Sequence, residues 1–243
     1  MTKPNSTEII FVVDRSGSME SIAADVCGGF ATFIAKQKET PGNCKVTLIQ
    51  FDDDYDVVYS ARPLNDVTSL VLEPRSSTAL HDAIGRTIND VGSRLKQLPE
   101  SERPAQVLFV IITDGLENAS REYNRQRVFD MITHQRDKYN WEFIFLGARQ
   151  DAIAIGQGLG VKGTNSVTYD ANADGSKALF RGLSANVSSY RVSGQGKMEN
   201  LYNQASYNTS LDPNALDADL IAGQTPDVKV NLSIAVTPPK TTP

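Results

Sequence analysis

The feature that most constrains the fold of this chain is a regular alternation of short apolar runs with amphipathic segments over residues 8–190. The runs 8–14 and 106–113 are almost continuously apolar and end at polar residues, which is typical of strands buried on both faces. In the segments between the runs, apolar residues recur at helical spacing, as in 80–95. Alternating strands and helices predict a mostly parallel sheet with right-handed crossovers.

The pattern predicts an α/β fold, a doubly wound, mostly parallel open sheet of the Rossmann-like kind. The short acidic link between the second and third strands makes one edge strand antiparallel. In such sheets, ligands bind beyond the carboxyl ends of the strands. The expected strands are 8–14, 45–51, 55–60, 106–113, 141–146 and 166–169, and the expected helices are 22–34, 80–95, 121–138, 152–158 and 179–190.

The composition changes near the end of this pattern, which predicts two parts. We expect one domain over residues 1–192 and a C-terminal extension over 193–243, mobile or partly strand-forming. Within the extension, 228–236 alternates like a strand. The extension also carries acidic residues that could occupy a metal site of the same or a neighbouring chain, so self-association through this tail is one hypothesis: Asp212, Asp217, Asp219 and Asp227.

The charge and the cysteine content exclude several classes of function. The chain has 24 basic and 29 acidic residues and a net charge of −5, which disfavours binding to nucleic acid. No apolar run approaches the ~20 residues that cross a bilayer, so no membrane association is expected. The first residues contain no signal-peptide hydrophobic region, and Cys27 and Cys44 lack metal-site spacing. We therefore expect a cytoplasmic protein with reduced cysteines.

Three segments next to the predicted strands and helices carry a matching set of oxygen ligands. Asp14, Ser16 and Ser18 follow the first strand, Thr78 precedes a helix, and Asp114 follows the most apolar strand. Two carboxylates and three hydroxyls without His or Cys suit hard divalent cations, above all Mg²⁺, with Mn²⁺ or Ca²⁺ as competitors. If the hydroxyls bind directly, the charge of the ion is poorly neutralised and attracts a further carboxylate.

This set resembles the von Willebrand factor A (vWA) domain with its metal-ion-dependent adhesion site (MIDAS). The family pattern is Asp-x-Ser-x-Ser, a Thr from a second loop and an Asp in a Thr-Asp-Gly context, and this sequence matches it at Asp14, Ser16, Ser18, Thr78 and Asp114. The resemblance covers about residues 8–190. It implies a metal bound by the hydroxyls, with the two carboxylates acting directly or through water. It also implies a protein partner that supplies a Glu or Asp to the metal.

Some of these residues, and others near them, also have roles other than metal binding open to them. Ser and Asp also favour helix N-caps, although capping does not explain five converging residues. The acidic segment 52–54 is expected to be a solvated hairpin turn, since it lacks EF-hand spacing. Glu117 and Asn118 follow Asp114 and are candidates for the rim of the site, and His81 is expected to have a packing or surface role.

Three hypotheses of function remain from the sequence. The leading one is a metal-dependent protein-protein interaction module, not an enzyme, with no catalytic residues. The second is a Mg²⁺-dependent hydrolase or phosphotransferase, which would have to use Asp14 because no other nucleophile or base stands near the metal loops. The third is a structural or assembly protein that uses its C-terminal tail.

Overall fold

A computed structural model of the chain shows a sheet with six strands in the residues that it describes. The structure describes residues 2–148 and 151–193, so the predicted extension 193–243 lies outside the described residues apart from Ser193. The strands lie in the order β3-β2-β1-β4-β5-β6, and only the β2–β3 pair is antiparallel. The strands are β1 (Lys3–Asp14), β2 (Asn43–Phe51), β3 (Tyr55–Pro63), β4 (Pro104–Thr113), β5 (Glu142–Ala148) and β6 (Ser166–Tyr169).

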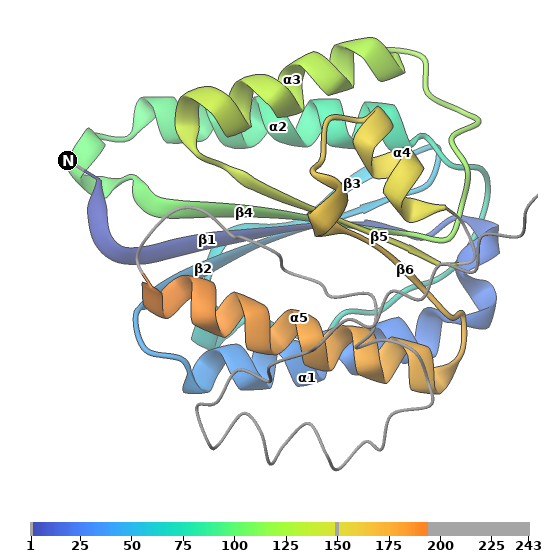
Figure 1. Cartoon of the computed structure of the whole chain (residues 1–243), viewed down its shortest axis with the longest axis horizontal. Helices are drawn as coiled ribbons and strands as arrows, with labels where there is room; N and C mark the ends of the chain where they lie inside the picture. The colour runs from blue at the N-terminus through green and yellow to red at the C-terminus, as the bar shows by residue number, and fades with distance from the viewer. Residues whose placement is uncertain (1, 149–150, 194–243) are drawn as a thin grey trace, which may run out of the picture. The chain divides into compact units, whose positions relative to one another are not determined.

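Helices cover both faces of this sheet. Figure 1 shows α2, α3 and α4 on one side, and α1 and α5 on the other. The α-helices are α1 (Ala23–Glu39), α2 (Leu80–Gln97), α3 (Arg125–Tyr139), α4 (Ala152–Gly158) and α5 (Ala173–Ser193). Short 3-10 turns are η1 (Gly17–Ser21), η2 (Leu64–Asp66), η3 (Glu100–Glu102) and η4 (Gly163–Asn165). The predicted doubly wound α/β fold with one antiparallel edge strand is confirmed.

The apolar runs of the central strands fill two separate cores. On β1, Phe11 and Val13 pack on the side of α1 and α5, whereas Ile10 and Val12 pack on the side of α2 and α3. Successive side chains of a strand point to opposite faces, so a strand covered on both faces needs apolar residues at every position. On β4, the same alternation buries Val110 and its neighbours in the two cores. The central strands therefore form a rigid base for the loops that follow them.

Several predicted boundaries differ from the observed ones, and the contacts of two of them explain the difference. The first strand was expected over 8–14 and begins at Lys3, because its polar start also pairs with β4 and Thr7 donates a hydrogen bond to the Gln106 side chain at 2.8 Å. The helix expected from residue 121 begins at Arg125. The residues before it are held in a loop, where the Asp82 carboxylate accepts their backbone N–H groups.

The acidic turn between β2 and β3 is not the fully solvated segment that the sequence predicts. The side chain of Asp52 is completely buried and pairs with Arg15 at 3.0 Å and with Arg75 at 2.7 Å. Burial by itself raises the pKa of Asp52, but hydrogen bonds, first from Arg75, outweigh it and hold the pKa below its ordinary value. Asp53 and Asp54 are exposed, as predicted.

In the part of the chain that the structure describes, no helix combines the length and the apolar character that a bilayer-spanning segment requires.

Candidate metal centre

The candidate centre lies where the direction of strand order reverses. β1 and β4 are neighbours in the sheet, and the order runs outward from them to β3 on one side and to β6 on the other. The chain leaves β1 toward α1 on one face and leaves β4 toward α3 on the other face (Figure 1). The loops after these two strands therefore diverge and leave room between them for a ligand.

The first loop begins with a buried carboxylate at the end of β1. Asp14 has no exposed surface, and its Oδ1 accepts a hydrogen bond from the backbone N–H of Ser16 at 2.6 Å. The Ser16 and Ser18 hydroxyl oxygens are 3.1 Å apart. Ser16 is the N-cap of η1, yet its side chain makes no capping hydrogen bond. Helix capping, the alternative reading of these residues, therefore does not account for the Ser16 hydroxyl.

The second loop is tied to the first by backbone hydrogen bonds. Gly17 N–H donates to the Ser76 carbonyl at 3.2 Å, and Arg75 N–H donates to the Arg15 carbonyl at 2.8 Å. Thr78 is buried two residues before α2. The N-cap of α2 is Ala79, which has no side chain able to cap, so Thr78 is not the cap of that helix.

The third loop joins the first through the side chain that ends β4. The Thr113 hydroxyl donates to Asp14 Oδ2 at 2.6 Å, and Gly115 N–H donates to Thr113 Oγ1 at 3.1 Å. Both carboxylate oxygens of Asp114 are buried, and Asp114 directly precedes Gly115. Asp114 thus lies between Thr113, which contacts Asp14, and Gly115.

Oxygen atoms from the first two loops converge beside Gly115. A Cβ atom added to this glycine would lie 2.5 Å from Thr78 Oγ1, and 3.1 Å from both Asp14 Oδ2 and Ser16 Oγ. Oxygen atoms of three separate residues therefore lie close to the position of this Cβ atom. Because Gly115 has no side chain, a small space remains among these oxygen atoms. Ser18 joins this group through its contact with Ser16. A space of this kind, surrounded by oxygen atoms, fits a hard divalent cation.

The electrostatics of the centre also fit a cation. Burial raises the pKa of Asp14, although hydrogen bonds from Thr113 and Ser16 reduce the effect. The neighbouring Arg15 directs its guanidinium to Asp52 and, at 2.6 Å, to Asp56. Within the described residues, no basic side chain forms an ion pair with Asp14. The buried carboxylate is therefore hydrogen-bonded but lacks a balancing positive charge.

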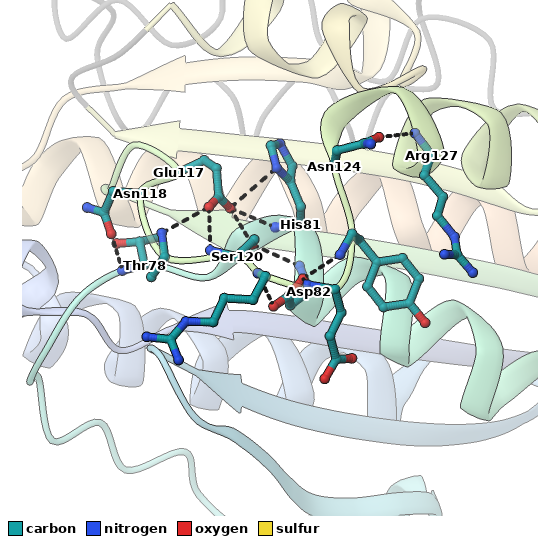
Figure 2. Close-up of polar contacts among 12 residues, drawn as sticks. Thr78, His81, Asp82, Glu117, Asn118, Ser120, Asn124 and Arg127 are labelled. Carbon is teal, nitrogen blue, oxygen red and sulfur yellow. Dashed lines mark hydrogen bonds and ion pairs between the residues drawn. The ribbon is translucent and has the colours of Figure 1, made fainter.

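Glu117 and Asn118, the candidates for the rim of the site, lie beside the centre in a hydrogen-bond network that also includes His81 (Figure 2). Asn118 is exposed and contacts the backbone of Thr78. Glu117 Oε2 accepts from the backbone N–H of His81 at 2.9 Å and lies 3.6 Å from its Nδ1. Burial lowers the pKa of His81, and the charge of Glu117 opposes this. His81 thus packs against the third loop.

From the sequence, Thr113 and Gly115 are only the residues that flank Asp114, and neither is predicted to have a role of its own. The structure gives Thr113 a direct hydrogen bond to Asp14, and Gly115 supplies the space among the oxygen atoms. The Thr-Asp-Gly segment was a signal for both. A cavity of about 340 Å³ opens near the first loop, lined by Arg15, Val71 and Arg75 among others, and none of the predicted metal ligands lines it.

Solved structures with similar folds come from several organisms. This chain aligns with the ArnB paralog VWA2 of Sulfolobus acidocaldarius at 18% identity and a TM-score of 0.50, over 74% of this chain and 44% of that one. The pilus adhesin SpaC of Lactobacillus rhamnosus GG aligns at 15% identity and a TM-score of 0.54, over 76% of this chain and 31% of that one. At these identities, the similarity shows the fold alone.

A third similar structure contains a metal. It is proximal thread matrix protein 1 of the mussel byssus with a zinc-occupied MIDAS motif, at 14% identity and a TM-score of 0.54, over 76% of this chain and 46% of that one. This chain spans less than half the length of each of these proteins. Curated protein sequences include none that matches this chain.

The family assignment comes from the sequence itself. The model of the von Willebrand factor type A domain matches residues 8–168, from the middle of β1 to β6. The matched segment contains all three loops of the candidate centre. The chain therefore belongs to the von Willebrand factor type A domain family.

Proposed function

We propose that this domain binds a divalent cation, Mg²⁺ in preference to Mn²⁺ or Ca²⁺, and through it an acidic residue of a protein partner. The proposed ligands are Asp14, Ser16, Ser18, Thr78 and Asp114. The observation that carries the proposal is the convergence of Thr78 Oγ1, Asp14 Oδ2 and Ser16 Oγ around the space beside Gly115. All of these donors are oxygen atoms, the ligand type that Mg²⁺ prefers.

Each proposed ligand has a distinct part in this function. The hydroxyls of Ser16, Ser18 and Thr78 would hold the cation without neutralising it. Asp14 already accepts hydrogen bonds on both oxygens, so it would act partly through water. When bound, the cation supplies Lewis acidity and a coordination position for an external carboxylate. The residues of this chain exclude water from one side and fix where that carboxylate docks.

The loops around the centre would contribute the specificity. Leu116 directly follows Gly115 and is 67% exposed, so the third loop offers an apolar contact beside the metal. Val71 is 65% exposed and lines the cavity near the first loop. A partner would thus place its acidic residue at the metal and apolar side chains against these two positions.

Relatives by fold support a binding role rather than an enzymatic one. SpaC is a pilus adhesin, and the mussel protein with zinc in its MIDAS motif is a thread matrix protein. Family membership itself is shown by the sequence match, whereas the metal, its identity and the partner belong to this proposal.

The proposal is tested by peptide selection on the immobilised full chain. Random displayed peptides are captured in MgCl₂ and eluted with EDTA. We expect the eluted peptides to share a Glu or Asp, and synthetic versions with Gln or Asn in its place to lose binding. The variant Asp14→Ala serves as the control surface. Peptides without an acidic residue, or equal capture by Asp14→Ala, would contradict the proposal.

A further inference from the structure

We infer that Asn118 and Glu117 are positioning residues that hold Thr78 in the geometry needed for metal binding. Neither residue belongs to the proposed ligand set, and the inference rests on the proposed function of that set. The two residues lie in the loop between β4 and α3, which thereby fixes the second loop as well as its own (Figure 2).

Asn118 pairs with both backbone groups of Thr78. The backbone N–H of Thr78 donates to the Asn118 side-chain Oδ1 at 2.9 Å. In return, the carbonyl of Thr78 accepts from the backbone N–H of Asn118 at 3.0 Å and from that of Ala119 at 3.1 Å. Thr78 is 2% exposed, so without these partners its amide would be buried and unsatisfied. Three hydrogen bonds therefore fix the backbone whose side chain carries a proposed metal ligand.

Glu117 caps α2 from outside that helix. The first N–H groups of a helix have no partner within it, and Ala79 at the N-cap supplies none. Glu117 Oε2 accepts from the backbone N–H of His81, and the Ser120 hydroxyl accepts from that of Asp82 at 3.1 Å. A carboxylate at this position also complements the positive end of the helix dipole. The third loop thus holds the beginning of α2, which directly follows Thr78.

Glu117 also folds its own loop into a fixed shape. Its Oε1 accepts from the backbone N–H groups of Ala119 at 3.0 Å and Ser120 at 2.8 Å, and its Oε2 from the Ser120 hydroxyl at 2.7 Å. Only 21% of the Glu117 side chain is exposed. The carboxylate therefore links the loop that carries Asn118 to the start of α2.

Asp82 anchors the far end of the same loop. Its carboxylate accepts three backbone N–H groups, from Arg121 at 2.8 Å, Glu122 at 2.9 Å and Tyr123 at 2.8 Å. The loop is thus held to α2 at both ends, and Thr78 and Asp114 are connected through it. Partners that orient metal ligands in this way affect metal affinity although they do not contact the metal.

The test is the Mg²⁺ affinity of the full-length Asn118→Ala variant, measured by titration calorimetry with MgCl₂ and repeated with MnCl₂. We expect binding about 10–100-fold weaker than in the parent. The matched control is Asn124→Ala, because Asn124 accepts from the backbone N–H of Arg127 at 2.9 Å and caps α3 without contacting Thr78. Asn124→Ala should lower the midpoint of thermal unfolding about as much as Asn118→Ala does, but it should bind Mg²⁺ with the affinity of the parent.

A conservative variant separates positioning from folding. Asn118→Asp keeps an oxygen acceptor for the Thr78 amide, so its affinity should return to at least one third of the parent value. Binding by Asn118→Ala as tight as by Asn124→Ala would overturn the inference while leaving the proposed metal site intact. A parent chain that binds neither metal at millimolar concentration would overturn the proposed function and this inference together.

Hydrogen exchange on the parent chain gives a second test that needs no variant. If the third loop and Thr78 form one unit, MgCl₂ should slow exchange at the amides of Thr78, Asn118 and Ala119 together. The amide of Arg127, capped by Asn124, should exchange at an unchanged rate. Protection of Thr78 without protection of Asn118 and Ala119 would contradict the inference.

Discussion

The strand β1 carries two buried carboxylates in opposite electrostatic settings, one in its middle and one at its carboxyl end. Near its middle, Glu8 is 1% exposed and accepts hydrogen bonds from the Thr47 hydroxyl at 2.9 Å and from the guanidinium of Arg94. At its carboxyl end, Asp14 is fully buried and accepts hydrogen bonds from neutral groups, those of Ser16 and Thr113 among them. One strand thus contains one acid with a balancing cation and one acid that lacks it within the described residues.

This difference distinguishes a charge that the fold itself balances from one that the proposed function assigns to a cation. Burying a carboxylate is unfavourable unless it is paired or hydrogen-bonded, and Arg94 provides the pairing for Glu8. Asp14 is followed directly by Arg15, but that guanidinium binds Asp52 and Asp56. The arginine nearest in sequence therefore does not neutralise Asp14, and under the proposed function a divalent cation would balance its negative charge.

The largest effect is expected when Glu8, the balanced acid of β1, loses its counterion. Arg94→Leu leaves the buried Glu8 without its cation and should reduce the free energy of unfolding by about 3 kcal/mol. Urea denaturation of the full chain in EDTA measures it. Lys36→Ala, which removes an exposed pair with Glu39, is the control and should cost less than about 1 kcal/mol. A loss in Arg94→Leu no larger than in this control would show that Glu8 needs no counterion.

The next effect concerns Asp52, a buried acid that is balanced although it lies beside the site. Asp52→Asn should reduce the free energy of unfolding by about 2 kcal/mol at pH 7, because Arg15 and Arg75 lose their shared carboxylate. Its lowered pKa means that this stabilisation is complete above the ordinary value of 3.8 and is lost as the pH falls through the lower value in the folded protein.

Denaturation curves at pH 7 and near pH 3 test this pH dependence, with Asp54→Asn as a control at an exposed position of the same turn. The difference in the free energy of unfolding between the parent and Asp52→Asn should be smaller near pH 3 than at pH 7. A difference that grows on acidification would have the wrong sign for a carboxylate with a lowered pKa.

Filling the space beside Gly115 should reduce the free energy of unfolding by less, but it should abolish metal binding. In Gly115→Ala, the new Cβ atom meets Thr78 Oγ1 at 2.5 Å, so we expect a loss of about 1–2 kcal/mol and no measurable Mg²⁺ binding. Gly28→Ala is the matched control, since nothing lies within 4 Å of its added Cβ atom in α1. That variant should gain about 0.5–1 kcal/mol and keep the metal. Wild-type affinity in Gly115→Ala would place the metal elsewhere.

The smallest change in stability is expected for Asp14→Asn. The asparagine can still accept from Ser16 N–H and can donate to the Thr113 hydroxyl, so metal-free stability at pH 7 should change by less than about 1 kcal/mol. Thermal and urea unfolding in EDTA measure it. A loss of 2 kcal/mol or more would make Asp14 a structural acid like Glu8, and the contrast between the two acids would fail.

The fold was predictable because its strongest signals are local. The continuous apolar runs of β1 and β4 reveal strands covered on both faces, and the short link before β3 reveals the antiparallel edge. The prediction failed where contacts between distant segments decide the structure. The start of α3 depends on Asp82, which lies in another helix, and the burial of Asp52 depends on Arg15 and Arg75.

The site was predictable only to the level of its loops. Residues after parallel strands meet at one edge of the sheet, so the approach of Asp14 and Thr113 followed from the strand pattern. The space at Gly115 and the hydrogen bonds between Asn118 and Thr78 depend on how the loops pack against each other, which periodicity does not reveal. The cytoplasmic location and the partner stay predictions, and the role of 193–243 lies outside the described residues.

Titration calorimetry of the full chain with MgCl₂ tests the central claim most directly, with Asp14→Asn and Glu8→Gln measured beside it. We expect one binding site in the parent and in Glu8→Gln, and no binding heat in Asp14→Asn. The absence of heat from the parent at millimolar Mg²⁺ and Mn²⁺, or unchanged binding by Asp14→Asn, would contradict the claim that the unbalanced acid of β1 holds a cation.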